Sequence, residues 1–217
     1  MRRWIAWADA VSVSLAAVCV VALLIRMALR APELHLPALA LGLVAGFAAA
    51  DVVSGLVHWF CDRYSHPRAR LIGPMLIAPF REHHVDPAAL ARHGVLERNG
   101  NNCLAALPLL VLAWCSLAPG AGSAAFAGVQ SGFWSGLAMT LCASNQVHAW
   151  AHVQTPPRFV RRLQRARVLL APERHAVHHR GGRAYAVVSG WSNAWLDALL
   201  PRVEALLTAL GARPGER

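Results

Sequence analysis

Four apolar stretches, separated by segments rich in arginine, constrain the fold of this chain more than any other feature. A transmembrane helix needs about 20 mostly apolar residues, and the candidates run over about 8–25, 36–60, 103–117 and 123–147. Hydrophobic residues make up 56% of the chain and charged residues only 15%, below the roughly 25% that is usual for soluble domains. We therefore predict an all-α membrane protein with about four transmembrane helices.

The placement of arginine predicts how these helices are oriented. Arginines are frequent in 61–102 and beyond 157, whereas the linker 118–122 carries no charge. Because segments rich in arginine stay in the cytoplasm, we expect both termini on that side, in a multi-pass protein of a bacterial inner membrane. Arg26 and Arg30 lie in the first predicted outer loop and oppose this assignment. The formal net charge of +10 is read as anchoring to lipid headgroups, with no nucleic-acid partner.

With His35, at the outer end of the second predicted helix, and His66, which precedes a proline in a loop, set aside, the other nine of the eleven histidines all fall on the predicted cytoplasmic side. Several are spaced so that they share one face of a helix, as in the pair His148 and His152, four residues apart, and in the motif His-Ala-Val-His-His that begins at His175. The nine are His58, His83, His84, His93, His148, His152, His175, His178 and His179. Neutral imidazole is the commonest metal ligand in proteins, so this convergence predicts a metal site, with the metal ions held in a cytoplasmic cap.

The residue types leave the metal open among iron, zinc and copper, all of which suit imidazole. Nine candidate ligands are enough for two ions. The sequence has no His-Glu-x-x-His motif, which argues against a zinc protease, and no Glu-x-x-His motif, which argues against a carboxylate-bridged di-iron bundle. Two irons held by histidines at the cytoplasmic face are typical of membrane desaturases and hydroxylases. A pH sensor and a non-catalytic metal or haem protein remain alternatives.

One acidic residue lies within a predicted membrane helix. Asp51 would lie about two helical turns deeper than His58, on the same helix face. A carboxylate in the hydrocarbon layer is costly and marks a functional site by default. Asp51 is therefore a candidate for a role at the predicted metal site.

Six segments between about Ala50 and Trp191 carry a family resemblance. They are ADVVSGLVHWFCD (50–62), GPMLIAPFREHHVDP (73–87), RHGVLERNGNN (92–102), NQVHAWAH (145–152), LLAPERHAVHH (169–179) and YAVVSGW (185–191). In content and order they resemble the Kua-type lipid desaturases, a family that includes plasmanylethanolamine desaturases and the bacterial CarF-like proteins. The segment RGGRAY, at 180–185, is more basic and richer in glycine than the resemblance leads us to expect.

The resemblance implies a fold similar to that of membrane fatty acid desaturases. An N-terminal anchor helix (1–35) would precede a lipid desaturase domain (36–200) and a C-terminal tail (201–217). The histidines would bind two iron ions, and Asp51, Asp62 and Asn145 would orient them by hydrogen bonding. Further candidate residues are the phosphate contacts Arg63, Arg81 and Arg92, for which plain cytoplasmic anchoring is the alternative.

The resemblance also implies a reaction. The 1-O-alkyl chain of an ether phospholipid would become the vinyl ether of a plasmalogen, with O2 as co-substrate. Two electrons would come from a small carrier such as a ferredoxin or a cytochrome b5-like protein. A related branch of the family desaturates the acyl chain of phosphatidylglycerol, and the motifs do not separate the two substrates. An acyl-chain desaturase or hydroxylase therefore stays open.

Overall fold

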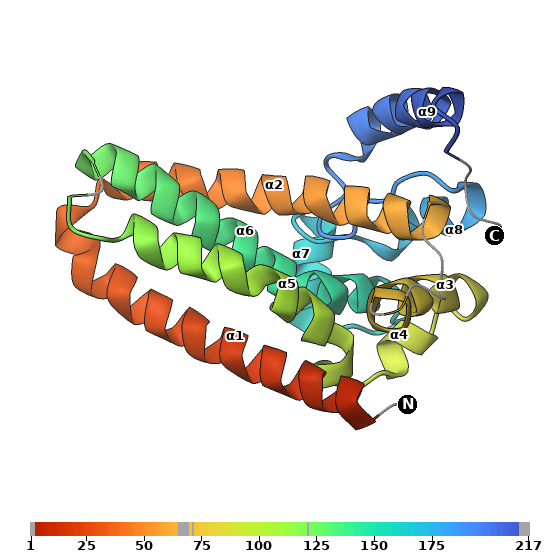
Figure 1. Ribbon diagram of the computed structural model, residues 1–217, viewed down its shortest axis with the longest axis horizontal. Coiled ribbons are helices and arrows are strands. Elements are labelled where there is room, and N and C mark those ends of the chain that lie inside the picture. Colours follow the sequence, from red (N-terminus) through yellow and green to blue (C-terminus); the bar gives the residue numbers. More distant parts are fainter. Residues whose placement is uncertain (1–2, 65–69, 71, 121, 213–217) are drawn as a thin grey trace. The chain divides into compact units, whose positions relative to one another are not determined.

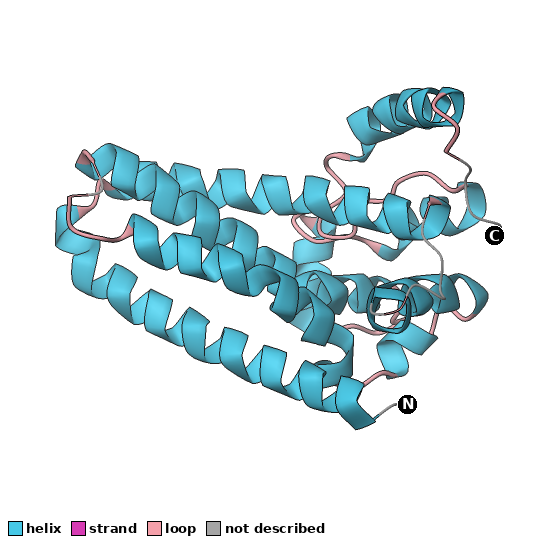
Figure 2. Cartoon of the chain, viewed as in Figure 1, coloured by secondary structure: helices cyan, strands magenta, loops and turns pink. Residues whose placement is uncertain are grey.

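The computed structural model describes residues 3–64, 70, 72–120 and 122–212, and these form helices without a strand (Figures 1 and 2). The predicted all-α class is confirmed. The long helices are α1 (Arg3–Arg30), α2 (Leu36–Arg63), α5 (Val95–Ser116) and α6 (Ala124–Ala151). The shorter ones are α3 (Ala78–Val85), α4 (Ala89–Arg92), α7 (Arg158–Arg165), α8 (Pro172–Gly181) and α9 (Asn193–Ala209). A 3-10 turn (Ala31–Glu33) follows α1, and a π-helical turn (Gly73–Ile77) precedes α3.

Among the described residues, two of the four predicted spans are both long enough and apolar enough to cross a membrane. They are Arg3–Glu33, which contains α1, and Leu36–Arg63, which is α2. At 22 and 28 residues, α5 and α6 are also long enough for a hydrocarbon layer of about 30 Å at roughly 1.5 Å per residue. They carry more polar side chains, however, so that four spans and a cytoplasmic cap stay a prediction.

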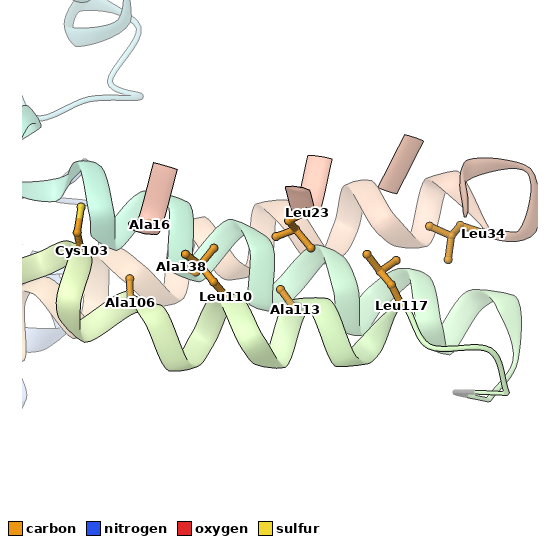
Figure 3. Packing of buried hydrophobic residues seen from close by; sticks show 9 residues of the cluster. All are labelled: Ala16, Leu23, Leu34, Cys103, Ala106, Leu110, Ala113, Leu117 and Ala138. Atoms are coloured by element: carbon orange, nitrogen blue, oxygen red, sulfur yellow. The ribbon is translucent and has the colours of Figure 1, made fainter. Parts of the chain in front are cut away.

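The first of two compact units consists of Met1–Ala50 and Gly94–Asn145. Within it α1 packs along α5, and the two helices lie side by side in Figure 1. Its core contains few large side chains, among them Leu23 of α1 and Leu110 of α5, with alanines between them (Figure 3). Small side chains let helices approach closely, which is how helices associate in membranes.

Glycines bring α2 and α6 into backbone contact in the same unit. A Cβ atom built on Gly46 would lie 2.2 Å from the carbonyl oxygen of Phe133, and one on Gly132 would lie 2.3 Å from that of Leu39. No side chain fits at such distances. The glycines recur every four residues, at Gly42 and Gly46 on α2 and at Gly128, Gly132 and Gly136 on α6. This is the Gly-x-x-x-Gly pattern of tightly packed membrane helices.

We predict that Gly46→Ala destabilises the protein by about 2 kcal/mol, because the added methyl group forces the two helix backbones apart. The melting temperature in detergent, followed by tryptophan fluorescence, should fall by roughly 4–8 °C. Gly94→Ala is the matched control, since a Cβ there would meet nothing within 4 Å. Equal melting temperatures for the two variants would show that α2 and α6 do not pack through Gly46.

The second unit consists of Asp51–His93 and Gln146–Arg217. It contains the end of α2, the end of α6 and the short helices α3, α4, α7, α8 and α9. Three small apolar clusters stabilise it, in place of one large core. Eight of the nine predicted metal ligands lie together among these clusters, as described next. The predicted division at residues 35 and 200 is not tested by these two units and stays a prediction.

Candidate metal centre

Eight histidines from four chain segments gather in the second unit. Short helices make this possible, because each one turns two or three histidines toward the same point. They are His58 from α2, His83 and His84 from α3, His148 and His152 from the end of α6, and His175, His178 and His179 from α8. Five of them are fully buried, namely His58, His83, His148, His175 and His178. Buried imidazoles at this density need a common partner.

One group of ligand atoms is centred on His175. Its Nε2 atom lies 2.8 Å from Nε2 of His148, 3.0 Å from Nε2 of His152 and 3.1 Å from Nε2 of His179. Two imidazole nitrogens that bind one metal ion at about 2.1 Å and at right angles are about 3.0 Å apart. His83 completes a set of four histidines, with His148, His152 and His175, whose ligand atoms all lie within 4.8 Å of one another. The nitrogens have the spacing of ligands to one ion.

The other group contains His58, His84 and His178, together with the same His83. Nε2 of His178 lies 3.3 Å from Nε2 of His84. The carboxylate oxygen Oδ2 of Asp62 lies 2.9 Å from Nε2 of His84. It lies 3.5 Å from Nε2 of His58 and 3.5 Å from Nε2 of His178. Oδ2 thus faces the Nε2 atoms, on the side of the rings where an ion would bind, whereas an orienting carboxylate contacts the other ring nitrogen. The ligand-orienting role of Asp62 stays a prediction. Because His83 belongs to both groups, the two sets of ligands form one centre.

Backbone carbonyls orient two of the rings. Nδ1 of His58 lies 2.9 Å from the carbonyl oxygen of Tyr185. Nδ1 of His178 lies 2.9 Å from that of Arg183. A carbonyl can only accept a hydrogen bond, so each Nδ1 carries the proton and each Nε2 carries the lone pair. Metal-binding histidines are usually held in this way.

Orphaned nitrogens show that the centre fits a metal. The Nε2 atoms of His58 and His83 are buried and have no hydrogen-bond partner among the described residues. Buried polar atoms are nearly always satisfied, and an exception calls for an explanation such as an ion. Both unsatisfied atoms lie among other imidazole nitrogens, and the Nε2 of His58 carries a lone pair because its Nδ1 faces a carbonyl oxygen. A bound cation would satisfy them.

Four of the rings have a lowered pKa and stay neutral at physiological pH. Burial, and then the neighbouring imidazoles, lower the pKa of His83 to about 2 and that of His178 to about 3. The same causes lower the pKa of His152 and of His179 to about 4. A neutral imidazole is the form that binds metal. Protons therefore compete weakly for these four ligands at neutral pH.

The carboxylate of Asp51 binds a loop and no histidine. Oδ1 accepts hydrogen bonds from the backbone N–H groups of Ser189 (2.7 Å) and Gly190 (2.9 Å). Oδ2 accepts them from the N–H (3.0 Å) and the hydroxyl (2.7 Å) of Ser192. This loop continues from Tyr185, whose carbonyl contacts His58. Asp51 thus holds the segment that orients a ring, and its predicted effect on the ligands would act through that segment.

Two other predicted site residues lie outside the histidine groups. Asn145, in the first unit, donates from Nδ2 to the carbonyl oxygen of Arg98 (2.8 Å) and to Oδ1 of Asn101 (3.3 Å), so it links α6 to α5. His93 is half-buried, follows α4 directly and belongs to neither group of four. The predicted orienting role of Asn145 has no direct contact to support it, and iron binding by His93 stays a prediction.

Two of the three predicted phosphate contacts are paired with carboxylates. Arg63 makes two hydrogen bonds to Glu204, at 2.9 and 3.0 Å, and Arg92 pairs with Asp86. Sequence reasoning missed Glu204, which is far along the chain and belongs to no motif. It also missed the carbonyls of Tyr185 and Arg183, because every residue has one and no letter of the sequence marks those that orient a ligand.

Comparisons with known proteins agree with this site. A model of the lipid desaturase domain matches residues 47–216, a stretch that includes every histidine of the centre. The chain is 41% identical over 177 residues to the plasmanylethanolamine desaturase of Myxococcus xanthus, which covers 78% of this chain and 60% of that protein. It is 35% identical over 198 residues to plasmanylethanolamine desaturase 1 of Mus musculus. This match covers 88% of this chain and 73% of the mouse protein.

A plant protein is also similar. The chain is 32% identical over 155 residues to the chloroplastic fatty acid desaturase 4 of Arabidopsis thaliana, covering 69% of this chain and 45% of that protein. No solved structure matches the chain. The family model covers most of the sequence, and α1 and α2 are apolar enough for a membrane protein. The chain therefore belongs to the lipid desaturase family.

Proposed function

We propose that this protein is a plasmanylethanolamine desaturase. It converts the 1-O-alkyl chain of an ether phospholipid into the vinyl ether of a plasmalogen. Two hydrogens leave the alkyl chain, and with two electrons and two protons from outside they reduce O2 to two molecules of water. The observation that carries the proposal is the pair of four-histidine groups that share His83. The names of the Myxococcus and mouse relatives support the choice of substrate.

The centre would hold two iron ions. His58, His84 and His178 form one set of ligands, His148, His152 and His175 form the other, and His83 lies between them. His179 adds a nitrogen beside His175. When bound, the metal pair supplies the activation of O2 that removal of hydrogen from an unactivated C–H bond requires. The protein holds the nitrogens as neutral donors, excludes water by burial and positions the lipid.

The surroundings of the centre fit a substrate that comes from a membrane. His58 lies in the last turns of α2, which is apolar enough to span the bilayer. We place this end of the helix, both termini and the centre at the cytoplasmic face, where arginine is frequent. The reducing electrons come from a small carrier there, a ferredoxin or a cytochrome b5-like protein.

Lipid analysis tests the proposed function. We expect a strain that lacks the protein, grown with a 1-O-alkyl phospholipid, to accumulate that lipid and to lose its vinyl ethers. Mass spectrometry of the extracted lipids measures both. Expression of the intact gene restores the vinyl ethers, whereas an inactive variant such as His175→Ala does not. Unchanged vinyl-ether content in the deletion strain would exclude the proposed activity.

An acyl-chain desaturase or hydroxylase is the second candidate. The similarity to a chloroplastic fatty acid desaturase of Arabidopsis thaliana favours it. The same deletion strain separates the two, because loss of this activity changes the fatty acids released from phospholipids and leaves plasmalogens intact. Vinyl ethers and fatty acids should therefore be measured in the same extract.

A further inference from the structure

A cavity adjoins the metal centre within the second unit. Its volume is about 680 Å³, and its walls come from the end of α2, from α3, α8 and α9, and from the turn after α8. Asp62, His84 and His178 of the centre line one wall. Leu200 and Pro201 of α9 provide apolar surface. A ligand in this cavity would therefore touch the residues that surround the proposed iron ions.

Two arginines of this cavity have no partner of opposite charge among the residues that the structure describes. Arg180 and Arg183 both line it and are exposed. Neither side chain has a hydrogen bond or an ion pair within the described part of the chain. Arg63, in the same lining, is by contrast neutralised by Glu204. As far as the described residues go, the cavity thus keeps two guanidinium groups near the centre without a neutralising carboxylate.

The turn between these arginines explains their placement. The sequence here is Arg-Gly-Gly-Arg, and Gly182 ends α8 with φ +57°, the left-handed conformation that favours glycine. The chain reverses there, so that Arg180 on the last turn of α8 and Arg183 beyond it both line the cavity. Guanidinium groups are well suited to phosphate, which they bind through two parallel N–H donors.

The proposed reaction requires a phosphate near the metal. The carbon to be desaturated is bonded to the ether oxygen, and six covalent bonds separate it from the phosphorus atom. At about 1.5 Å per bond, phosphorus lies within roughly 9 Å of that carbon even in a fully extended chain. A lipid whose first alkyl carbons reach the centre must therefore place its phosphate in the immediate surroundings. The cavity with its two arginines is such a place.

We infer that this cavity binds the headgroup of the substrate phospholipid, with Arg180 and Arg183 on its phosphate. The inference rests on the proposed function. Asp197 also lines the cavity, and its Oδ1 accepts a hydrogen bond from the backbone N–H of Ala184 at 2.8 Å. This leaves Oδ2 for the ammonium group of an ethanolamine headgroup. The arginines bind the phosphate, and Asp197 selects a cationic headgroup.

Lipid binding by the purified full-length protein in detergent tests the inference. The probes are radiolabelled 1-O-hexadecyl-2-acyl-glycerophosphoethanolamine and 1-O-hexadecylglycerol, which lacks the phosphate. We expect the double variant R180Q/R183Q to bind the phospholipid about tenfold more weakly, because two charge-assisted contacts are lost. Its binding of hexadecylglycerol should not change. The variant R158Q/R162Q removes the same charge from α7, outside the cavity, and should match the wild type within about twofold.

Two further measurements separate the sources of phosphate and the headgroups. Inorganic phosphate should compete only at millimolar concentrations, and competition as strong as that of the phospholipid would mean a free-phosphate site and overturn the inference. D197N keeps the hydrogen-bonding oxygen and loses the charge. It should remove the preference for an ethanolamine over a glycerol headgroup, and an unchanged preference would refute the role of Asp197.

The inference and the proposed function can fail separately. If the wild type forms vinyl ethers and R180Q/R183Q keeps both its affinity and its KM, the headgroup does not bind here. If the wild type binds the phospholipid through both arginines but forms no vinyl ether, the cavity is a headgroup site for another reaction. Where both hold, R180Q/R183Q should raise KM about tenfold and change kcat little, since it removes binding and not chemistry.

Discussion

Replacement of His175 by alanine is expected to abolish the proposed desaturation, with a loss of at least about 100-fold, and to remove one of the two proposed iron ions. His175 is the hub of its group, because its Nε2 lies within 3.1 Å of Nε2 of His148, His152 and His179. Its loss leaves that ion without its central ligand. Vinyl-ether formation measured by mass spectrometry and metal content per purified chain provide the two readouts.

His35→Asn is the control for this experiment. His35 precedes α2, and its Nδ1 accepts a hydrogen bond from the N–H of Ala38 at 3.2 Å. Asparagine is a good N-cap residue, so this variant loses a histidine outside the centre and keeps the helix start. We expect wild-type activity and metal content. Full iron content in His175→Ala would contradict the ligand assignment, even if activity were lost.

Replacement of Asp51 by alanine is expected to destabilise the protein by roughly 3 kcal/mol or more, because it leaves four buried donors of the loop Ser189–Ser192 without an acceptor. The melting temperature in detergent should fall by about 6–12 °C. Metal content should fall as well, since the same loop continues into Tyr185, whose carbonyl orients His58. Tryptophan fluorescence and metal analysis of the purified protein measure the two effects.

Asp86→Ala is the matched control, because Asp86 is exposed and pairs with an exposed arginine. Surface ion pairs contribute little to stability, and the hydrogen bonds that the carboxylate accepts from the backbone of Ala88 and Ala89 add a modest contribution, as at a helix N-cap. This variant should therefore melt well above Asp51→Ala. Asp51→Asn keeps one oxygen acceptor, so its melting temperature should lie between those of Asp51→Ala and Asp86→Ala. Should Asp51→Ala melt with the wild type while losing activity, Asp51 would have a direct role in the chemistry and none in holding the loop.

The histidines were predictable because their chemistry is local. Spacings of three and four residues placed His148 with His152, and His175 with His178 and His179, on shared helix faces. In the structure the last three lie on α8, His148 lies on α6 and His152 directly follows α6. The apolar stretches likewise predicted α1 and α2, although both helices extend past the apolar residues. No prediction was drawn from the Gly-x-x-x-Gly spacing of α2 and α6, although this pattern favours close helix packing.

Other parts of the site depend on contacts between distant segments. The sequence placed Asp51, Asp62 and Asn145 in one class, the residues that orient ligands. In the structure Asp62 contacts three histidines, Asp51 holds a loop and Asn145 joins two helices. The partners Glu204 and Ser192 lie about 140 residues from Arg63 and Asp51. A spacing rule reaches one or two helical turns, so it cannot find such pairs.

The sequence by itself determined that the chain is helical, that two of its helices suit a membrane and that it belongs to the lipid desaturase family, because residue type and spacing along a helix act locally. Only the tertiary structure decided which histidines share an ion-sized space, which ring nitrogen of His58 and His178 faces that space and which arginines of the cavity lack an acidic partner within the described part of the chain. These properties arise when segments far apart in the chain bury polar atoms against one another. A buried polar atom without a partner costs free energy, so the chain folds such that these atoms contact partners from other segments.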